Sequence, residues 1–248
     1  MSQILLYHYP MSICSMKVRL CLSELSIPYE ERIVDIGLAL ENLEPWYVRI
    51  NPRGVVPTLC DGNHTVTDSA RIMRYLAERS GKGLPGDPNQ RAEVERWVEA
   101  ADTFPLHAIS YGRGGIPRGN EVLESRLARI ELNSKLYPEL SDTWTALHRR
   151  VSVLRDASAD GASTQKALDE LDAVFTRLDT VLAASPFISS SEYSIADVIW
   201  TVTLARLDML KLGDLFACFQ SLSAYYDRMI QRPSFASAKI RRAWVGAI

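Results

Sequence analysis

The run Gln3-Ile4-Leu5-Leu6-Tyr7-His8-Tyr9 is followed closely by Met11-Ser12-Ile13-Cys14-Ser15-Met16-Lys17, and the hydrophobic period changes between them. The first run is short and apolar, which is typical of a strand buried on both faces. From the second run on, apolar residues recur at helical spacing as far as Leu25, which predicts one buried face of a helix. The sequence therefore predicts a strand over 3–9 that turns directly into a helix over 14–26.

Ser12 and Cys14 stand at the start of this predicted helix. Serine is a favoured N-cap, and Cys14 falls in the first turn. Free backbone N–H groups and the positive end of the helix dipole favour an anion there, so a thiolate of Cys14, or one brought by a ligand, is stabilised. The residues alone leave a second interpretation equally open, in which Ser12 only caps the helix and Cys14 only packs.

The composition narrows the class of protein. A chain of 248 residues with 47% hydrophobic and 23% charged residues predicts one large globular domain or two small ones. A net charge of −2 gives the chain no overall positive charge that would attract nucleic acid. The four cysteines show no C-x-x-C spacing, so neither a metal site nor a disulfide framework is predicted. With no signal-peptide pattern and no long apolar run, we expect a cytoplasmic protein without a membrane partner.

A segment rich in Gly and Pro divides the chain, and it predicts a mixed domain over 1–80, a linker over 81–90 and an all-helical domain over 91–248. In the first domain the predicted elements are strand 3–9, helix 14–26, strand 29–35, helix 38–49, a hairpin of strands 55–60 and 64–67, and helix 69–80. This order is βαβαββα. In the second domain helices are predicted over 90–110, 121–156, 163–184, 194–212 and 220–231, with Pro138 kinking or dividing the second.

Two further places in the first domain carry polar or unusual residues. Pro57 lies within a strand-like run, and one use of such a proline is a cis peptide that leaves the N–H and C=O of Val56 for a ligand. Asp68 and Ser69 open the last helix and are good caps. They also suit the charged end of an amino-acid-like ligand, Ser69 for a carboxylate and Asp68 for an ammonium group.

In combination these motifs resemble the glutathione transferase superfamily. The resemblance rests on Ser12-x-Cys14 at a helix start, the run Asn51 to Leu59 before a hairpin, and Asp68-Ser69 at a helix start. It continues with Ser194-Ile195-Ala196-Asp197, which has the form of a capping box before an apolar helix. The resemblance implies a thioredoxin-like N-terminal domain joined to an all-α C-terminal domain, glutathione as cosubstrate, and a homodimer.

The same resemblance implies how glutathione binds. Its cysteinyl backbone pairs with Val56 beside cis-Pro57, and Asp68 and Ser69 hold its γ-glutamyl end. The family more often has Glu-Ser at that pair, so Asp68 is one methylene shorter. Asn42 is the candidate for the glycyl carboxylate.

The motif Ser12-Ile13-Cys14-Ser15-Met16-Lys17-Val18-Arg19 is similar to two groups in the superfamily, the zeta-type maleylacetoacetate isomerases and the reductive dehalogenases of chlorinated hydroquinones. The second group is favoured. It implies that Ser12 activates the glutathione thiolate against a quinoid or halogenated aromatic electrophile. It further implies that Cys14 takes glutathione off the conjugate as a mixed disulfide, and it makes Ser15 a third catalytic candidate.

The loop Tyr111 to Gly119 is either a plain turn or part of the electrophile pocket, with Tyr111, Arg113 and Arg118 as candidates to bind a phenolate or carboxylate. Two alternatives to a dehalogenase stay open: a glutathione-dependent cis–trans isomerase, and a non-enzymatic ligand-binding or stress protein with the same fold.

Overall fold

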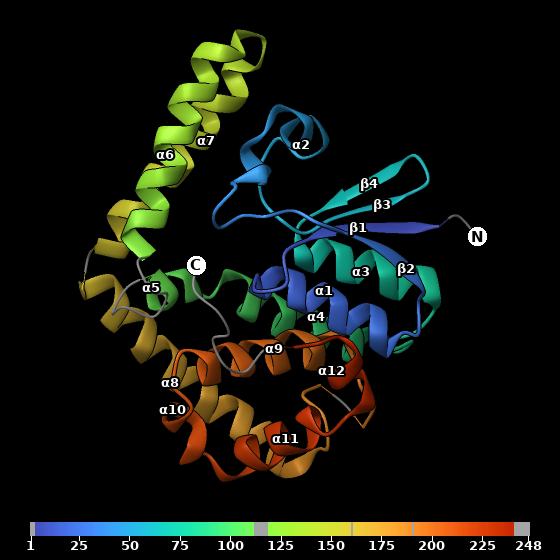
Figure 1. The fold of residues 1–248 in the computed structure, drawn as a ribbon. Helices are drawn as coiled ribbons and strands as arrows, with labels where there is room; N and C mark the ends of the chain where they lie inside the picture. Colours follow the sequence, from blue (N-terminus) through green and yellow to red (C-terminus); the bar gives the residue numbers. More distant parts are fainter. Residues whose placement is uncertain (1–2, 112–118, 160, 190, 241–248) are drawn as a thin grey trace.

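The computed structural model describes residues 3–111, 119–159, 161–189 and 191–240. Two of the predicted substrate-binding residues, Arg113 and Arg118, lie outside the described residues. Figure 1 shows a small sheet with its helices beside a larger all-helical part.

The sheet has four strands in the order β2-β1-β3-β4. Its strands are β1 (Ile4–His8), β2 (Tyr29–Ile33), β3 (Thr58–Asp61) and β4 (His64–Thr67). β1 and β2 are parallel, with helix α1 (Ile13–Glu24) as the crossover, and the other pairs are antiparallel. The predicted order βαβαββα is therefore confirmed.

Helices α1 and α3 (Ser69–Ser80) pack against each other below the sheet (Figure 1). α3 ends as predicted before Gly81, whose φ of 66° is the left-handed conformation that glycine adopts at no steric penalty. On the other face of the sheet, Tyr7 of β1 and Val56 pack with Tyr47.

The helix predicted over 38–49 is confirmed only from Pro45 on, and its first part is wrong. The chain forms a loop, a short 3₁₀ turn η1 (Glu41–Leu43) and then α2 (Pro45–Ile50). The carboxylate of Asp35 accepts hydrogen bonds from the backbone N–H groups of three following residues, which holds them in a turn. Leu40 has a left-handed φ of 53°, and α2 begins only where its proline can take the first helical position.

The rest of the described chain is helical. Its elements are α4 (Pro88–Thr103), α5 (Leu106–Tyr111), α6 (Gly119–Leu136), η2 (Pro138–Leu140), α7 (Ser141–Ala159), α8 (Gly161–Ala184), α9 (Ile195–Met209), α10 (Asp214–Ala217), α11 (Gln220–Ile230) and α12 (Pro233–Ser237). Pro105 divides the helix predicted over 90–110, and Pro138 divides the one predicted over 121–156, because proline cannot continue a helix. Within the described residues, none of these helices is long and apolar enough to cross a bilayer.

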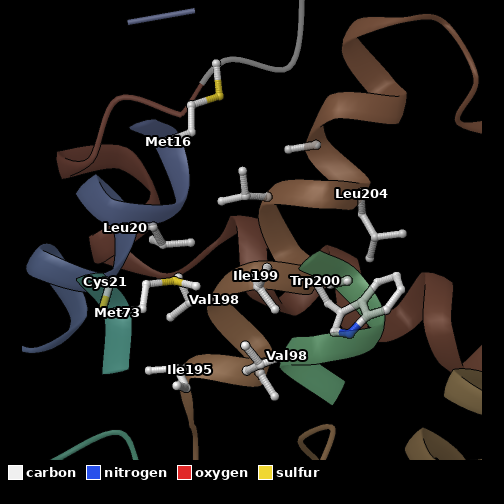
Figure 2. Packing of buried hydrophobic residues seen from close by; sticks show 14 of the residues in the cluster. Met16, Leu20, Cys21, Met73, Val98, Ile195, Val198, Ile199, Trp200 and Leu204 are labelled. Atoms are coloured by element: carbon white, nitrogen blue, oxygen red, sulfur yellow. The ribbon is translucent and has the colours of Figure 1, made fainter. Parts of the chain in front are cut away.

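One hydrophobic core joins the sheet part to the helical part. α9 lies between α1 and α4 and packs against both (Figure 2). Leu20 of α1 is buried with Val198 of α9 in the same cluster, and Trp200 of α9 lies beside Val98 of α4 (Figure 2). The predicted linker over 81–90 stays a prediction, but the packing ties α9 rigidly to the start of α1.

The capping box predicted at the start of α9 is confirmed. Ser194 Oγ accepts the Ala196 N–H at 3.2 Å, and Asp197 Oδ2 accepts the Ser194 N–H at 2.9 Å. Asp197 is fully buried and also accepts from the Ile188 N–H and the Tyr225 hydroxyl, each at 3.0 Å. Burial nevertheless raises the pKa of Asp197 to about 6, because the low-polarity surroundings oppose its charge more than these donors favour it.

Candidate active site

A cleft of about 720 Å³ lies between the sheet part and the helical part. Its walls come from the start of α1, the loop before β3, the start of α3, and helices α4 to α7 and α9. The sequence-predicted residues that line it are Ser12, Cys14, Asn42, Val56, Pro57, Asp68, Ser69 and Tyr111. Residues that are far apart in the chain therefore meet at one place, as a binding site requires.

Ser12 is the N-cap of α1, as predicted. Its Oγ accepts the Ser15 N–H at 3.4 Å, which leaves its own hydroxyl proton to donate elsewhere. Cys14 is the second residue of α1 and is partly exposed in the cleft. A hydroxyl donor and a thiol therefore share the first turn of a helix, where the backbone field favours an anion.

Ser15 does not line the cleft with them. Its side chain is fully buried, and its Oγ accepts the Tyr9 N–H at 3.2 Å. This contact fixes the turn between β1 and α1. The predicted catalytic role of Ser15 therefore rests on the resemblance alone.

Two buried cations near Cys14 were not predicted. Lys17 of α1 is only 5% exposed and lines the cleft. Arg206 of α9 is 4% exposed, and its Nη2 donates to the Met11 carbonyl at 2.6 Å, one residue before Ser12. Burial lowers the pKa of Arg206, and Tyr111 and Cys14 act against that shift. The sequence signal that could have pointed to this residue is an arginine directly after the apolar run Val198 to Ala205.

The peptide bond between Val56 and Pro57 is cis, which confirms that prediction. β3 begins only at Thr58, so Val56 is outside the ladder, and among the described residues its N–H and C=O make no hydrogen bond. The preceding carbonyl, that of Val55, accepts from the Tyr47 hydroxyl and from Asn51 Nδ2, both at 2.7 Å. These hydrogen bonds hold the loop in place, while the backbone N–H and C=O of Val56 remain available to an extended ligand.

Asp68 both caps α3 and faces the cleft. Its Oδ1 accepts the backbone N–H groups of Ala70 and Arg71, each at 3.1 Å, and its Oδ2 lies 3.8 Å from Arg53. Partial burial raises the pKa of Asp102 on α4, and the charge of Asp68 raises it further. The interaction between the two carboxylates places acidic groups from two helices at this end of the cleft, where a cationic group is favoured.

Asn42 lines the cleft but is already engaged. Its Nδ2 donates to the Gly54 carbonyl at 2.8 Å, and the side chain is only 4% exposed. Gly54 has a left-handed φ of 52°, and an added Cβ would lie 3.1 Å from the Asn42 carbonyl oxygen. The contact therefore shapes the loop before Val56, and the predicted role of Asn42 toward the glycyl carboxylate stays a prediction.

The wall of the cleft on α6 and α7, opposite Val56 and Asp68, carries apolar and cationic side chains. Arg126 of α6 donates to the Tyr111 hydroxyl at 3.4 Å and to the Ile36 carbonyl at 3.1 Å. Arg150 of α7 also lines the cleft. Apolar side chains line the same cleft, among them Phe104. Sequence reasoning missed both arginines because their helices reach this wall only through tertiary packing.

The fold and the cleft together indicate the class of protein to which the chain belongs. A thioredoxin-like domain with a Ser-x-Cys helix start and a cis-proline opposite it is joined to an all-helical part that completes the cleft. Residues 6–86 match the glutathione S-transferase N-terminal domain, and residues 134–228 match the glutathione S-transferase C-terminal domain.

Individual proteins agree with these matches. The chain is 41% identical over 248 residues, the full length of both chains, to tetrachloro-p-hydroquinone reductive dehalogenase of Sphingobium chlorophenolicum. It is 28% identical to 2,5-dichlorohydroquinone reductive dechlorinase of Sphingobium indicum, covering 97% of this chain and 83% of that one. The crystal structure of beta-etherase LigF from Sphingobium sp. strain SYK-6 superposes with a TM-score of 0.76 at 23% identity, covering 95% and 98% of the two chains.

The chain therefore belongs to the glutathione S-transferase family, an enzyme family whose cosubstrate is glutathione. The predicted family, fold, enzyme class and cosubstrate are confirmed. This membership counts against the non-enzymatic alternative. The roles of the individual site residues stay predictions.

Proposed function

We propose that this enzyme reductively dehalogenates a halogenated hydroquinone, with glutathione as reductant and Cys14 as the thiol that completes the reduction. The observation that carries the proposal is the placement of Ser12 and Cys14 in one helical turn, inside the cleft that Val56 and Asp68 also line. The likeness to two enzymes named as hydroquinone dehalogenases supports the choice of substrate.

In the first step, glutathione lies along Val56 with its γ-glutamyl end at Asp68 and Ser69. The Ser12 hydroxyl donates to the sulfur and favours the thiolate. The thiolate adds to a halogen-bearing carbon of the quinoid tautomer, a C–S bond forms, and halide leaves with the C–halogen electron pair. The product of this step is a glutathionyl hydroquinone.

In the second step, the Cys14 thiolate attacks the sulfur of this conjugate. An S–S bond forms, the C–S electron pair goes to the ring, and the ring carbon takes a proton, which gives the reduced hydroquinone and a mixed disulfide. A second glutathione thiolate attacks the mixed disulfide and releases glutathione disulfide and the Cys14 thiolate. In sum, one carbon–halogen bond becomes carbon–hydrogen and two glutathione thiols become one disulfide.

The test is the Cys14→Ser variant, with tetrachlorohydroquinone and glutathione as substrates. We expect the variant to form the glutathionyl conjugate and to stop there, because serine cannot take the sulfur. Mass spectrometry of the products and of the intact protein reads out the conjugate and the mixed disulfide. Cys60→Ser is the matched control, since Cys60 is also a partly exposed cysteine of the same domain but does not line the cleft.

Full dehalogenation by Cys14→Ser would contradict the proposal. If that variant and the wild type both convert maleylacetone and neither dehalogenates, the isomerase alternative holds instead.

We extend the proposal to a cytoplasmic homodimer that serves aromatic catabolism or detoxification. Support for this extension comes from the family resemblance.

A further inference from the structure

The wall of the cleft opposite the glutathione side holds a cation that has no counter-ion among the described residues. Arg150 of α7 lines the cleft, and within the described part of the chain its guanidinium has no hydrogen-bond or salt-bridge partner. Burial, together with like-charge repulsion from Arg53 and Arg126, lowers the pKa of Arg150 to about 10. Grouping cations without a carboxylate is unfavourable in the free protein, so this arrangement indicates an anionic ligand.

Among the described residues, the carboxylates of the cleft lie on the glutathione side, whereas its cations lie on both sides. Asp68 and Asp102 line the cleft and interact with each other, and the cations that act on Asp102 are Lys17, Arg74 and Arg53. Within the described part of the chain, no carboxylate acts on Arg150. The glutathione end therefore favours an ammonium group, whereas the α6–α7 wall favours a negative charge.

The α6–α7 wall is also built to orient a ligand. Arg126 is anchored through the Ile36 carbonyl and the Tyr111 hydroxyl, yet its buried Nε has no hydrogen-bond partner among the described residues. A buried donor left without a partner is unfavourable and is normally satisfied by a ligand or water. Apolar side chains that line the same cleft, namely Phe104, Leu106, Val122 and Leu154, supply a surface for an aromatic ring.

We propose that Arg150, with Arg126 and Tyr111, binds the ring oxygen of the electrophile as a phenolate, so that the enzyme selects halogenated aromatics that carry an ionised hydroxyl. This inference rests on the proposed function and specifies its substrate class. Negative charge develops on the ring oxygen when a thiolate adds to the ring, and again when Cys14 removes the sulfur. A guanidinium pair at that oxygen stabilises both species.

The experiment measures binding without turnover. S-methylglutathione, which has no free thiol, saturates the glutathione side. Calorimetry then compares pentachlorophenol, at a pH where it is ionised, with its neutral methyl ether pentachloroanisole. We expect the wild type to bind the phenolate at least about tenfold more tightly than the ether, as for a hydrogen bond to a charged group. In Arg150→Met that preference falls by about tenfold, and Arg150→Lys keeps part of it.

Arg149→Met is the matched control, because Arg149 is the neighbouring arginine of α7 and is exposed outside the cleft. It should leave the preference unchanged. Equal affinity of the wild type for both probes overturns the inference. So does an Arg150→Met variant that loses S-methylglutathione binding while keeping its phenolate preference, because Arg150 then belongs to the glutathione site. Phenolate binding without any dehalogenation refutes the proposed function and leaves this anion site standing.

Discussion

Arg206 connects the helical part to the catalytic turn at the scale of a single residue. Its Nη2 donates to the Met11 carbonyl at 2.6 Å and its Nη1 lies 3.1 Å from the sulfur of Met209, so the guanidinium is fixed from both sides. Since Met11 precedes Ser12, this contact positions the N-cap of α1. The same cation attracts a thiolate at Cys14. Arg206 thus acts as a positioning residue for the predicted nucleophiles.

Arg206→Met is expected to slow the alkylation of Cys14 by iodoacetamide at neutral pH several-fold, because the variant removes a buried cation that interacts with Cys14. Peptide mass spectrometry gives the rate for each cysteine separately. Exposed Cys218 is the internal reference and should react at an unchanged rate. Arg206→Lys keeps the charge and should recover part of the rate. Equal slowing at both cysteines, or no slowing at Cys14, would show that Arg206 only packs.

Sequence reasoning found the residues whose surroundings are local. Ser12 caps because it directly precedes a helix, and the cis peptide lies where the run Val56-Pro57 suggested. By contrast, Arg150 and Arg206 reach the cleft from helices far along the chain. Their positions depend on how those helices pack, and the periodicity of a helix does not encode that. The part of the cleft wall that these helices supply therefore could not be predicted.

At the scale of elements, periodicity succeeded for long helices and failed for short or interrupted ones. The end of α3 was predicted from Gly81, whereas the helix predicted over 38–49 is divided into the 3₁₀ turn η1 and the short helix α2. Leu40 packs with the apolar residues of η1 and α2 but has a positive φ, so the helical period extends beyond the helix. α10 and α12 have four and five residues, which is too short for periodicity to show.

The capping box of α9 makes stability depend on pH. The pKa of buried Asp197 is about 6 in the folded chain, above its ordinary value of about 3.9. A carboxyl group whose pKa is raised in the folded state binds its proton more tightly there than in the unfolded chain. Its contribution to the free energy of unfolding is therefore fully present below about pH 4 and is lost as the pH rises through 6. We therefore expect wild-type stability, relative to Asp197→Asn, to fall by about 2 kcal/mol between pH 4 and pH 7.

Chemical denaturation of both proteins across that pH range measures the difference. Asp197→Asn cannot titrate at this position, so every other group cancels in the comparison. The prediction fails if the difference in unfolding free energy between the wild type and Asp197→Asn stays constant between pH 4 and pH 7 or grows with pH. Either result would show that the hydrogen-bond donors around Asp197 outweigh the effect of its burial.

At the scale of the whole molecule, the cleft exists only when both parts are in place. α6 and α7 lie side by side and extend beyond the rest of the helical part toward α2 (Figure 1). Asn133 of α6 donates to the Leu43 carbonyl at 2.7 Å, and Arg49 of α2 pairs with Glu139 at 2.9 Å. These contacts, together with the contact of Arg206 with the start of α1, hold the α6–α7 wall opposite Val56. Substrate selection is therefore a property of the assembled chain.

The shared core predicts that the two parts unfold together. Leu20 of α1 is 1% exposed within the cluster that includes α9 and α11. Leu20→Ala should lower the unfolding free energy by about 2–5 kcal/mol. Hydrogen exchange should report that loss equally in β1 and in α11, because one cluster spans both. Leu127→Ala is the control: Leu127 is buried in a separate cluster formed by η1, α2, α6 and α7, so its loss should concentrate in those elements. If Leu20→Ala lowers protection in the sheet part alone, the two parts are independent units, and the cleft between them is held by surface contacts rather than by a common core.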